Sequence, residues 1–357
     1  MQKILVGLSG GVDSAVCAYL LKLAGYEVIG ATLRTWVNEC GEDSRCCEID
    51  DAREIADFLG IPYYVKNCMA EFKEKVTEPF IFEYLSGRTP NPCVGCNRTV
   101  KWAKMLEMAD ALGADLVATG HYATIVRKEN SRLTVKQSPF AAKDQSYMLY
   151  RLTQEQLART IMPLGPLTKE EVRNIAGKAG IPVAEKPDSQ EICFIPDGDY
   201  AGYIDRTSTR EVPPEGNFVD AEGRILGRHK GITHYTVGQR KGLGLAMGVP
   251  VFVREIRAET NEVVIGSNED LFSDTVFCRD LNFLSIPGLA PGETIPAVVR
   301  IRYHHKGEEA RVRLAGDDLA EITFKRPVRA AAPGQAAVFY DEDGCVIGGG
   351  TIIFKSV

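Results

Sequence analysis

The sequence has no long apolar run. Of its 357 residues, 45% are hydrophobic and 25% charged, and the apolar stretch near the start is short and interrupted by glycines and by Asp13. A membrane-spanning helix needs about 20 consecutive apolar residues, and a secretory signal needs its own apolar core. We therefore expect a cytoplasmic protein with no membrane partner. Single cores rarely exceed about 250 to 300 residues, so we also expect two or three domains.

An excess of positive charge is also missing. The formal net charge is −6, which argues against a surface coated for nonspecific nucleic-acid binding and restricts any RNA site to a local patch. The stretch 224–254 contains no acidic residue and is the best candidate for such a patch. A glycine-rich surface loop is an equally weighted interpretation of it. Its basic residues are Arg224, Arg228, Lys230, Arg240, Lys241 and Arg254.

The glycine-rich turn near the start lacks the lysine of the common phosphate-binding loop. Residues 9–14 spell SGGVDS, between an apolar strand predicted at 3–8 and a helix predicted at 13–23. Gly10 and Gly11 allow close approach of a phosphate, while backbone N–H groups and the helix N-terminus supply partial positive charge. In the common phosphate-binding loop, the lysine reaches the terminal phosphates. The motif therefore predicts a nucleotide site of another kind, against the alternative of a βα turn without a ligand.

The ten cysteines are not typical of a disulfide framework or of a structural zinc site. A long chain without a secretion signal is expected to keep its thiols reduced. Cys93 and Cys96 form a CxxC with no second pair, so a redox disulfide, half of a metal site and buried packing thiols all remain open. A helix predicted to begin just after Cys96 would favour its thiolate form. Seven other cysteines are taken as core or incidental thiols: Cys17, Cys40, Cys46, Cys47, Cys68, Cys278 and Cys345.

Strands and helices alternate through the first half of the chain. Strand patterns at 27–33, 62–67 and 115–120 are separated by helical patterns at 50–60, 72–87 and 100–113, which predicts a parallel, doubly wound sheet. A capping pattern, Thr168 and Glu171, opens another predicted helix. Evenly spaced short strands from about residue 274 suggest a small barrel. We expect an α/β domain over 1–200, a small α+β or β domain over 201–272, and a β-barrel over 273–357.

Motifs spread over the whole chain resemble those of the bacterial tRNA-specific 2-thiouridylases. They are GLSGGVDS at 7–14, GRTPNPCVGCN at 87–97, ATGHY at 118–122, KDQSY at 143–147, DSQEICFI at 188–195 and HYTVGQRKGLG at 234–244. The match extends into RPVRAAAPGQAAVFY at 326–340. The resemblance implies a first domain of the PP-loop type (N-type ATP pyrophosphatase), with an adenine nucleotide α-hydrolase-like sheet. It also implies a tRNA-uridine 2-sulfurtransferase.

The same resemblance implies a mechanism that uses ATP and Mg²⁺. ATP would adenylate the C2 oxygen of the wobble uridine (U34) in tRNAs for lysine, glutamate and glutamine. Cys193 would carry a persulfide loaded by a sulfur-relay protein or a cysteine desulfurase, and Cys96 would be the nucleophile or resolving thiol. The two thiols would approach each other as an alternate disulfide. The expected partner is tRNA and the expected state a monomer.

Site residues are carried over from the motifs of that family. Bases outside a duplex are read by edge hydrogen bonds and stacking, which suits Asn, Gln and Tyr, while Lys and Arg suit phosphates. The implied ATP contacts are Gly7, Leu8, Ser9, Gly10, Gly11, Val12, Asp13, Ser14, Leu33 and Gly120. The implied contacts to the target base are Asn91, Pro92 and Cys93, and those to the rest of the tRNA are His121, Lys143, Asp144, Gln145, Arg302, Tyr303 and Gln335. Asp13 is left between two roles, a ligand of Mg²⁺ through the pyrophosphate and a helix cap.

Cys93 departs from the family pattern, in which this position is often Asp. Cys93, Cys96 and Cys193 would together supply three soft ligands, so an alternative to the persulfide is a [4Fe-4S] cluster with one iron open. A PP-loop amidoligase that installs nitrogen is a more distant alternative, because it would not need paired catalytic cysteines. A noncatalytic tRNA-binding protein and a thiol oxidoreductase are the remaining ones.

Overall fold

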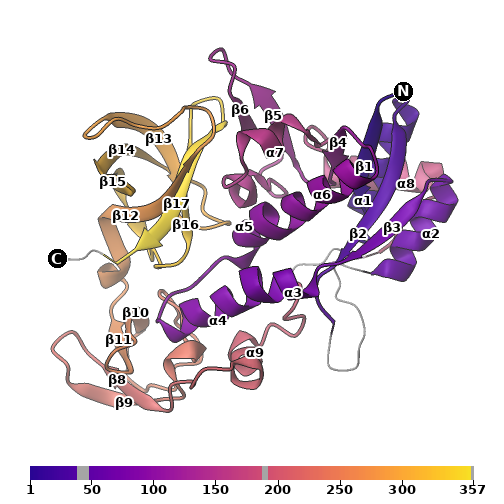
Figure 1. The fold of residues 1–357 in the computed structure, drawn as a ribbon. Coiled ribbons are helices and arrows are strands. Elements are labelled where there is room, and N and C mark those ends of the chain that lie inside the picture. Colours follow the sequence, from indigo (N-terminus) through magenta and orange to yellow (C-terminus); the bar gives the residue numbers. More distant parts are fainter. Residues whose placement is uncertain (38–47, 187–191, 355–357) are drawn as a thin grey trace.

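The computed structural model describes residues 1–37, 48–186 and 192–354. Cys40, Cys46 and Cys47 lie outside the described residues, as does Asp188 of the DSQEICFI motif. In chain order the described part forms a helix-covered parallel sheet, a four-stranded sheet and a closed barrel (Figure 1). This confirms the predicted fold class. None of the helices in these ranges is both long and apolar enough to cross a bilayer.

The first sheet is parallel and five-stranded, with strand order β3-β2-β1-β4-β7. β1 pairs in parallel with β2 on one side and with β4 on the other, so the strand order reverses at β1. In doubly wound sheets, ligands bind beyond the carboxyl ends of the strands at such a point. The strands are β1 (Lys3–Gly7), β2 (Glu27–Arg34), β3 (Tyr63–Asn67), β4 (Leu116–Ala118) and β7 (Thr160–Ile161).

Helices cover both faces of this sheet because alternate side chains of β1 point to opposite faces. Ile4 and Val6 pack with α1 (Val12–Leu23), α2 (Ile49–Leu59) and α8 (Lys169–Ala179). Leu5 packs on the other face with α6 (Ala103–Ala111). The predicted capping box of α8 is present, with Thr168 and Glu171 each bonded to the other's backbone N–H.

Between β3 and β4 the chain forms two helical runs, each with a π-helical turn. The first is α3 (Met69–Phe72), η1 (Lys73–Thr77) and α4 (Glu78–Leu85); the second is α5 (Pro92–Cys96), η2 (Asn97–Trp102) and α6. The prediction that the second run begins after Cys96 is wrong. It begins at Pro92, whose fixed φ and missing N–H suit the first helical position. A π-helical turn therefore follows Cys96 directly, and such turns are frequent at functional sites.

A connecting segment between the first sheet and the barrel was not predicted. It contains the hairpin of β5 (Ala123–Arg127) and β6 (Leu133–Gln137), the 3₁₀ turn η3 (Ser146–Leu149) and α7 (Gln154–Ala158). In Figure 1 this segment lies between the parallel sheet and the barrel. The backbone of Gln137 donates to the carbonyl of Gly344 in the barrel, which ties the two units together.

The second half of the chain is almost wholly β. After α9 (Tyr200–Thr207) come β8 (Gly216–Val219), β9 (Ile225–His229), β10 (Phe252–Arg257) and β11 (Glu262–Gly266), in sheet order β10-β11-β8-β9. The closed barrel follows the order β12-β15-β14-β13-β16-β17. Its strands are β12 (Phe272–Phe283), β13 (Thr294–Arg300), β14 (Glu308–Gly316), β15 (Leu319–Arg329), β16 (Ala336–Tyr340) and β17 (Val346–Ile353). Ala336, Val338 and Tyr340 pack in one apolar cluster with Leu5 and Trp102, so the barrel shares a core with the first sheet.

Candidate active site

The SGGVDS turn lies at the carboxyl end of β1 and leads into α1. Gly10 has a φ of +77°, and a β-carbon there would lie 2.8 Å from the β-carbon of Glu48. Both the backbone angle and the space therefore require glycine. The Ser14 hydroxyl donates to the carbonyl of Gly11 at 2.9 Å and accepts from the N–H of Ser9 at 3.1 Å. These bonds fix the turn in the shape that a phosphate would meet.

Two residues far away in the sequence hold Asp13 of this turn. The Tyr122 hydroxyl donates to Asp13 Oδ1 at 2.7 Å, and Lys169 Nζ, in the first turn of α8, lies 2.7 Å from the same oxygen. No side chain caps α1, whose N-cap residue is Gly11. Of the two roles considered for Asp13, the helix cap is therefore wrong. The structure instead gives an ion pair that brings a lysine to a loop whose own sequence has none.

Gly120 and Leu33 lie beside the turn at the same edge of the sheet. A β-carbon at Gly120, just after β4, would lie 2.7 Å from the carbonyl carbon of Asp13 and 2.9 Å from the backbone nitrogen of Ser14. Leu33, near the carboxyl end of β2, packs against both the core of the sheet and the apolar cluster that carries the cysteines. The structure thus gathers the predicted ATP contacts at the carboxyl ends of three neighbouring strands.

Cys96 and Cys193 pack against the same apolar cluster. Both are half-buried, and Cys193 is a free thiol. The aromatic ring of Phe194, next to Cys193, lies edge-on to the rings of Phe72 and Phe80, with centroids 5.6 Å and 5.3 Å apart. Two thiols from distant parts of the chain are therefore held around one core.

Cys93 has different surroundings. It is exposed. It lies in the first turn of α5, whereas the sequence predicted that a helix would begin only after Cys96. Burial is the main cause that raises the pKa of Tyr303, and Asp144 and Cys93 raise it to a smaller degree. Within residues 1–37, 48–186 and 192–354, no three His, Cys, Asp or Glu side chains converge as metal ligands. The three cysteines, all in these ranges, therefore do not converge on a site that fits a [4Fe-4S] cluster.

Of the predicted tRNA contacts from the barrel, Gln335 reaches the loop that precedes α5, whereas Arg302 bonds within the barrel. Gln335 Nε2 donates to the carbonyl of Thr89 at 2.9 Å, and Arg302 donates to the carbonyl of Arg329 at 3.0 Å. Asn91, Pro92, Tyr150 and Ala336 are among the residues lining a cavity of about 200 Å³ between the first unit and the barrel. The structure brings the predicted base contacts Asn91 and Pro92 and the barrel residue Gln335 to one boundary between domains.

Other predicted tRNA contacts are turned inward. The side chain of Asp144 is only 3% exposed, and Gln145 Oε1 accepts from the backbone N–H of Tyr122 at 3.0 Å. The ring of His121 lies 5.3 Å from that of Trp102, and burial together with Lys101 holds the pKa of His121 well below its usual value. His121 is therefore neutral at pH 7. A direct contact between the Asp144 carboxylate and tRNA would require the carboxylate to leave its buried place.

The basic stretch 224–254 is partly neutralised. Arg224 pairs with Asp220 at 2.5 Å and with Glu222 at 3.1 Å, two acids that lie just before the stretch. The side chains of Lys230, Arg240, Lys241 and Arg254 are exposed. Positive charge thus remains on the central domain, though less than the sequence predicted.

Comparisons with known proteins identify the family. Family models match three consecutive parts of the chain: a tRNA methyl transferase HUP domain at 2–197, a tRNA methyl transferase PRC-barrel domain at 204–267 and an aminomethyltransferase beta-barrel domain at 273–352. The tRNA-specific 2-thiouridylase MnmA of Lachnoclostridium phytofermentans is 54% identical over 99% of this chain and 100% of that protein. The chain belongs to the tRNA-specific 2-thiouridylase family. The resemblance drawn from its motifs is thereby confirmed.

Other members of the 2-thiouridylase family match equally completely. The MnmA of Clostridioides difficile is 47% identical over 100% of this chain and 99% of that protein. Among solved structures, the U34-tRNA thiolase NcsA from Methanococcus maripaludis with its [4Fe-4S] cluster is 19% identical, with a TM-score of 0.36 over 58% of this chain and 67% of that chain.

Three residues near the site were missed by sequence reasoning. Tyr122 lay within a recognised motif, but the motif did not indicate that its hydroxyl reaches Asp13. Lys169 followed a recognised helix cap, yet nothing local linked α8 to the nucleotide turn. Arg300, at the end of β13, forms the partner of Asp144. A pairing of charges across so many residues has no signal in a single sequence.

Proposed function

We propose that this 2-thiouridylase family member uses ATP to replace the C2 oxygen of the wobble uridine by sulfur in tRNAs for lysine, glutamate and glutamine. The observation that supports the proposal is that the two cysteines and the nucleotide turn lie at the same edge of the parallel sheet. Leu33 and Trp36, at the carboxyl end of β2, pack against the cluster that holds Cys96 and Cys193. β2 pairs in parallel with β1, so this end of β2 lies beside the end of β1 from which the SGGVDS turn starts.

The nucleotide turn would hold the pyrophosphate part of ATP. Backbone N–H groups and the hydroxyls of Ser9 and Ser14 are suitable donors, and the N-terminus of α1 favours negative charge. Lys169 supplies the nearby positive charge that the turn itself lacks. Mg²⁺ bound with ATP would supply further neutralisation of the phosphates. In the activation step, the uridine oxygen attacks the α-phosphorus and pyrophosphate leaves, so that AMP becomes the leaving group at C2.

The two half-buried cysteines would then deliver sulfur. A sulfur-relay protein or a cysteine desulfurase loads Cys193 as a persulfide, whose terminal sulfur attacks C2 and displaces AMP. The thiolate of Cys96 next attacks the sulfur of Cys193, which breaks the bond to the transferred sulfur and leaves 2-thiouridine and a Cys96–Cys193 disulfide. A dithiol reductant restores both thiols. Their packing against one cluster supports this pairing.

The tRNA would bind along the boundary between the first domain and the barrel. We assign the domains to 1–200, 201–272 and 273–357. In this proposal the target base meets Asn91, Pro92 and Cys93, while Lys143, Arg302, Tyr303 and Gln335 contact the rest of the anticodon region. His121 and Gln145, both partly exposed, would add further contacts to the tRNA. The exposed basic residues of the central domain would add phosphate contacts.

The test is a thiolation assay with anaerobically purified protein of measured iron content. Unmodified tRNA, Mg-ATP and a persulfide donor are supplied, and 2-thiouridine and AMP are quantified. We expect one AMP for each 2-thiouridine formed in iron-free protein, and loss of thiolation in Cys96→Ser and Cys193→Ser but not in Cys345→Ala, a buried barrel thiol. AMP formation that survives both substitutions, with no 2-thiouridine formed even by the wild-type protein, would indicate an amidoligase. No AMP formation at all would indicate a noncatalytic tRNA-binding protein.

A further inference from the structure

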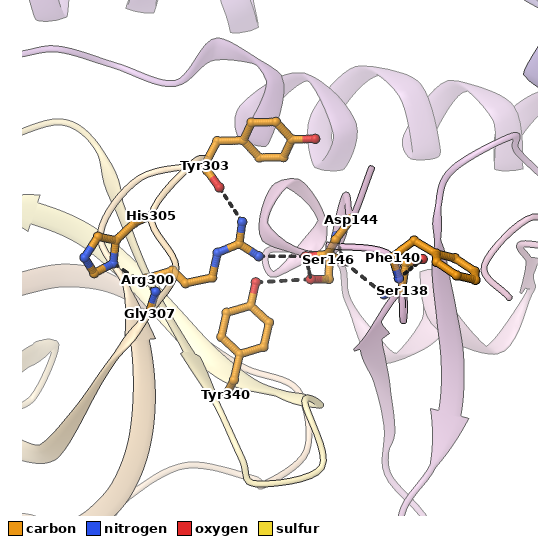
Figure 2. A network of polar contacts seen from close by, with 9 residues as sticks. All are labelled: Ser138, Phe140, Asp144, Ser146, Arg300, Tyr303, His305, Gly307 and Tyr340. Carbon is orange, nitrogen blue, oxygen red and sulfur yellow. Dashed lines mark hydrogen bonds and ion pairs between the residues drawn. The ribbon is translucent and has the colours of Figure 1, made fainter. Parts of the chain in front are cut away.

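A buried ion pair joins the first domain to the barrel. Arg300, the last residue of β13, places Nη1 2.6 Å from Asp144 Oδ2, and the two side chains are 9% and 3% exposed. Asp144 belongs to the connecting segment between the parallel sheet and the barrel. Figure 2 shows the guanidinium reaching out of the barrel toward this segment. Breaking such a pair by removing one partner leaves the other charge buried and uncompensated.

Every oxygen of the Asp144 carboxylate is in use. Oδ1 accepts from the backbone N–H groups of Ser138 and Ser146 at 3.1 Å and 3.2 Å. Oδ2 accepts from the Ser146 hydroxyl at 3.0 Å as well as from Arg300. The hydroxyl of Tyr340, at the end of β16, lies 3.1 Å from that of Ser146 (Figure 2). The carboxylate is therefore a structural centre and has no oxygen left for a substrate.

Arg300 carries the connection to the proposed tRNA surface. Its Nη2 donates to the carbonyl of Tyr303, and its guanidinium lies 5.7 Å from the ring of Tyr147 and 5.8 Å from that of Tyr340. A movement of Tyr303 on binding tRNA would thus act directly on the pair with Asp144.

The segment next to Asp144 reaches the nucleotide turn. Gln145 exchanges two hydrogen bonds with the backbone of Tyr122, one from its own N–H and one to its side-chain oxygen, both at 3.0 Å. The hydroxyl of Tyr122 in turn donates to Asp13. Two hydrogen-bonded steps therefore separate Gln145, the chain neighbour of Asp144, from the proposed pyrophosphate site.

The same segment also reaches the cysteines. Met148, in η3, accepts hydrogen bonds from the side chains of Asn91 at its sulfur (3.4 Å) and Asn97 at its carbonyl (3.1 Å). Asn91 and Asn97 directly flank α5, the short helix that contains Cys93 and Cys96. η3 is thus tied by hydrogen bonds to both ends of the short helix that carries Cys93 and Cys96.

We propose that Asp144 and Arg300 are a positioning pair that couples tRNA binding at the barrel to adenylation and to sulfur transfer. The inference rests on the function proposed above and deepens it. Neither residue touches substrate; the pair acts through Tyr303, Gln145 and Met148. With the pair intact, the tRNA surface, the nucleotide turn and the cysteine helix move as one unit, so that AMP formation and thiolation stay matched.

The test compares Asp144→Asn and Arg300→Met with a second boundary pair. Asp144→Asn keeps the volume but turns one acceptor into a donor that faces Arg300. The matched control is Lys128→Met, which removes the bonds from Lys128 to Asp341 (3.0 Å) and Asp343 (3.7 Å), also between the first domain and the barrel. Misplacing a reacting group by about 1 Å can lower a rate about 100-fold. We expect thiolation to fall about 10-fold to 100-fold in the two test variants and less than about 2-fold in the control.

The decisive readout is the ratio of AMP to 2-thiouridine. It should rise several-fold above the wild-type ratio in Asp144→Asn and Arg300→Met, with the KM for ATP within about 2-fold, because the nucleotide turn itself is unchanged. If Asp144→Asn and Arg300→Met do not fold, Tyr340→Phe takes their place, because it removes only the hydroxyl that contacts Ser146. It should also raise the ratio of AMP to 2-thiouridine. An unchanged ratio in all folded variants, or an equal rise in Lys128→Met, would overturn the proposal. Absence of thiolation in the wild-type protein would instead refute the proposed function.

Discussion

Replacing Gly120 by alanine would press a methyl group against the start of α1. The new β-carbon would lie 2.7 Å from the carbonyl carbon of Asp13, 2.8 Å from its oxygen and 2.9 Å from the nitrogen of Ser14. Carbon contacts are comfortable at about 3.5 Å or more, so the nucleotide turn must move by roughly 0.8 Å. All three neighbours are backbone atoms, and no flexible side chain can absorb the change. Overpacking of this kind costs about 1 to 3 kcal/mol.

The same displacement should be visible in catalysis. A shift approaching 1 Å at the reacting groups can lower the rate about 100-fold, which corresponds to about 2.7 kcal/mol of transition-state stabilisation. We therefore expect Gly120→Ala to lower kcat/KM for ATP about 100-fold in the thiolation assay, while tRNA binding measured without ATP stays near the wild-type value.

The matched control is Gly177→Ala. Gly177 lies in α8 with nothing within 4 Å of its would-be β-carbon, so the substitution should leave kcat/KM unchanged and stabilise the helix by up to about 1 kcal/mol. The reasoning is refuted if Gly120→Ala retains the wild-type kcat/KM for ATP, or if both glycine variants lose it equally.

Three further predictions follow from single contacts. Lys169→Met removes the cation beside Asp13 and should raise the KM for ATP at least about 10-fold, or about 1.4 kcal/mol; an unchanged KM in initial-rate measurements would show that Lys169 plays no part in ATP binding. Thr168→Ala removes the capping box with Glu171 and should cost about 1 kcal/mol in thermal or denaturant melting, without a change in kcat. His121→Gln should flatten the pH dependence of stability: burial keeps the folded histidine neutral, whereas the unfolded chain takes up a proton below its usual pKa of 6.5, so wild-type stability should fall as the pH drops below that value. Melting at about pH 5.5 and about pH 7.5 checks this, and equal slopes in wild type and variant would contradict it.

Local patterns made much of the fold predictable. The SGGVDS turn depends only on two glycines and on the strand and helix beside it, and the capping box of α8 lies within four residues. The barrel strands were visible from their alternation and spacing. By contrast, β7 has only two residues, and it belongs to the sheet only through its pairing with β4. A strand this short has no periodicity of its own.

The inward-facing part of the site was not predictable in this way. Asp144 belongs to a recognised motif, but a motif does not say whether its acid faces solvent or an arginine 156 residues away. The start of α5 was misplaced because the prediction weighed the apolar pattern after Cys96 above the proline at position 92. Tertiary contacts decide burial and charge pairing, and these are the properties on which the coupling of the site depends.

The central claim is that sulfur passes through Cys193 and Cys96 without an iron–sulfur cluster. The measurement that tests it most directly is thiolation by Cys93→Ser purified anaerobically, with iron, acid-labile sulfide and persulfide on Cys193 quantified in the same sample. We predict that Cys93→Ser, which keeps a side chain of similar size beside the target base, still thiolates tRNA, contains no iron and carries a persulfide on Cys193. Loss of both iron and thiolation in Cys93→Ser, from a wild-type protein that contains a cluster, would contradict the account.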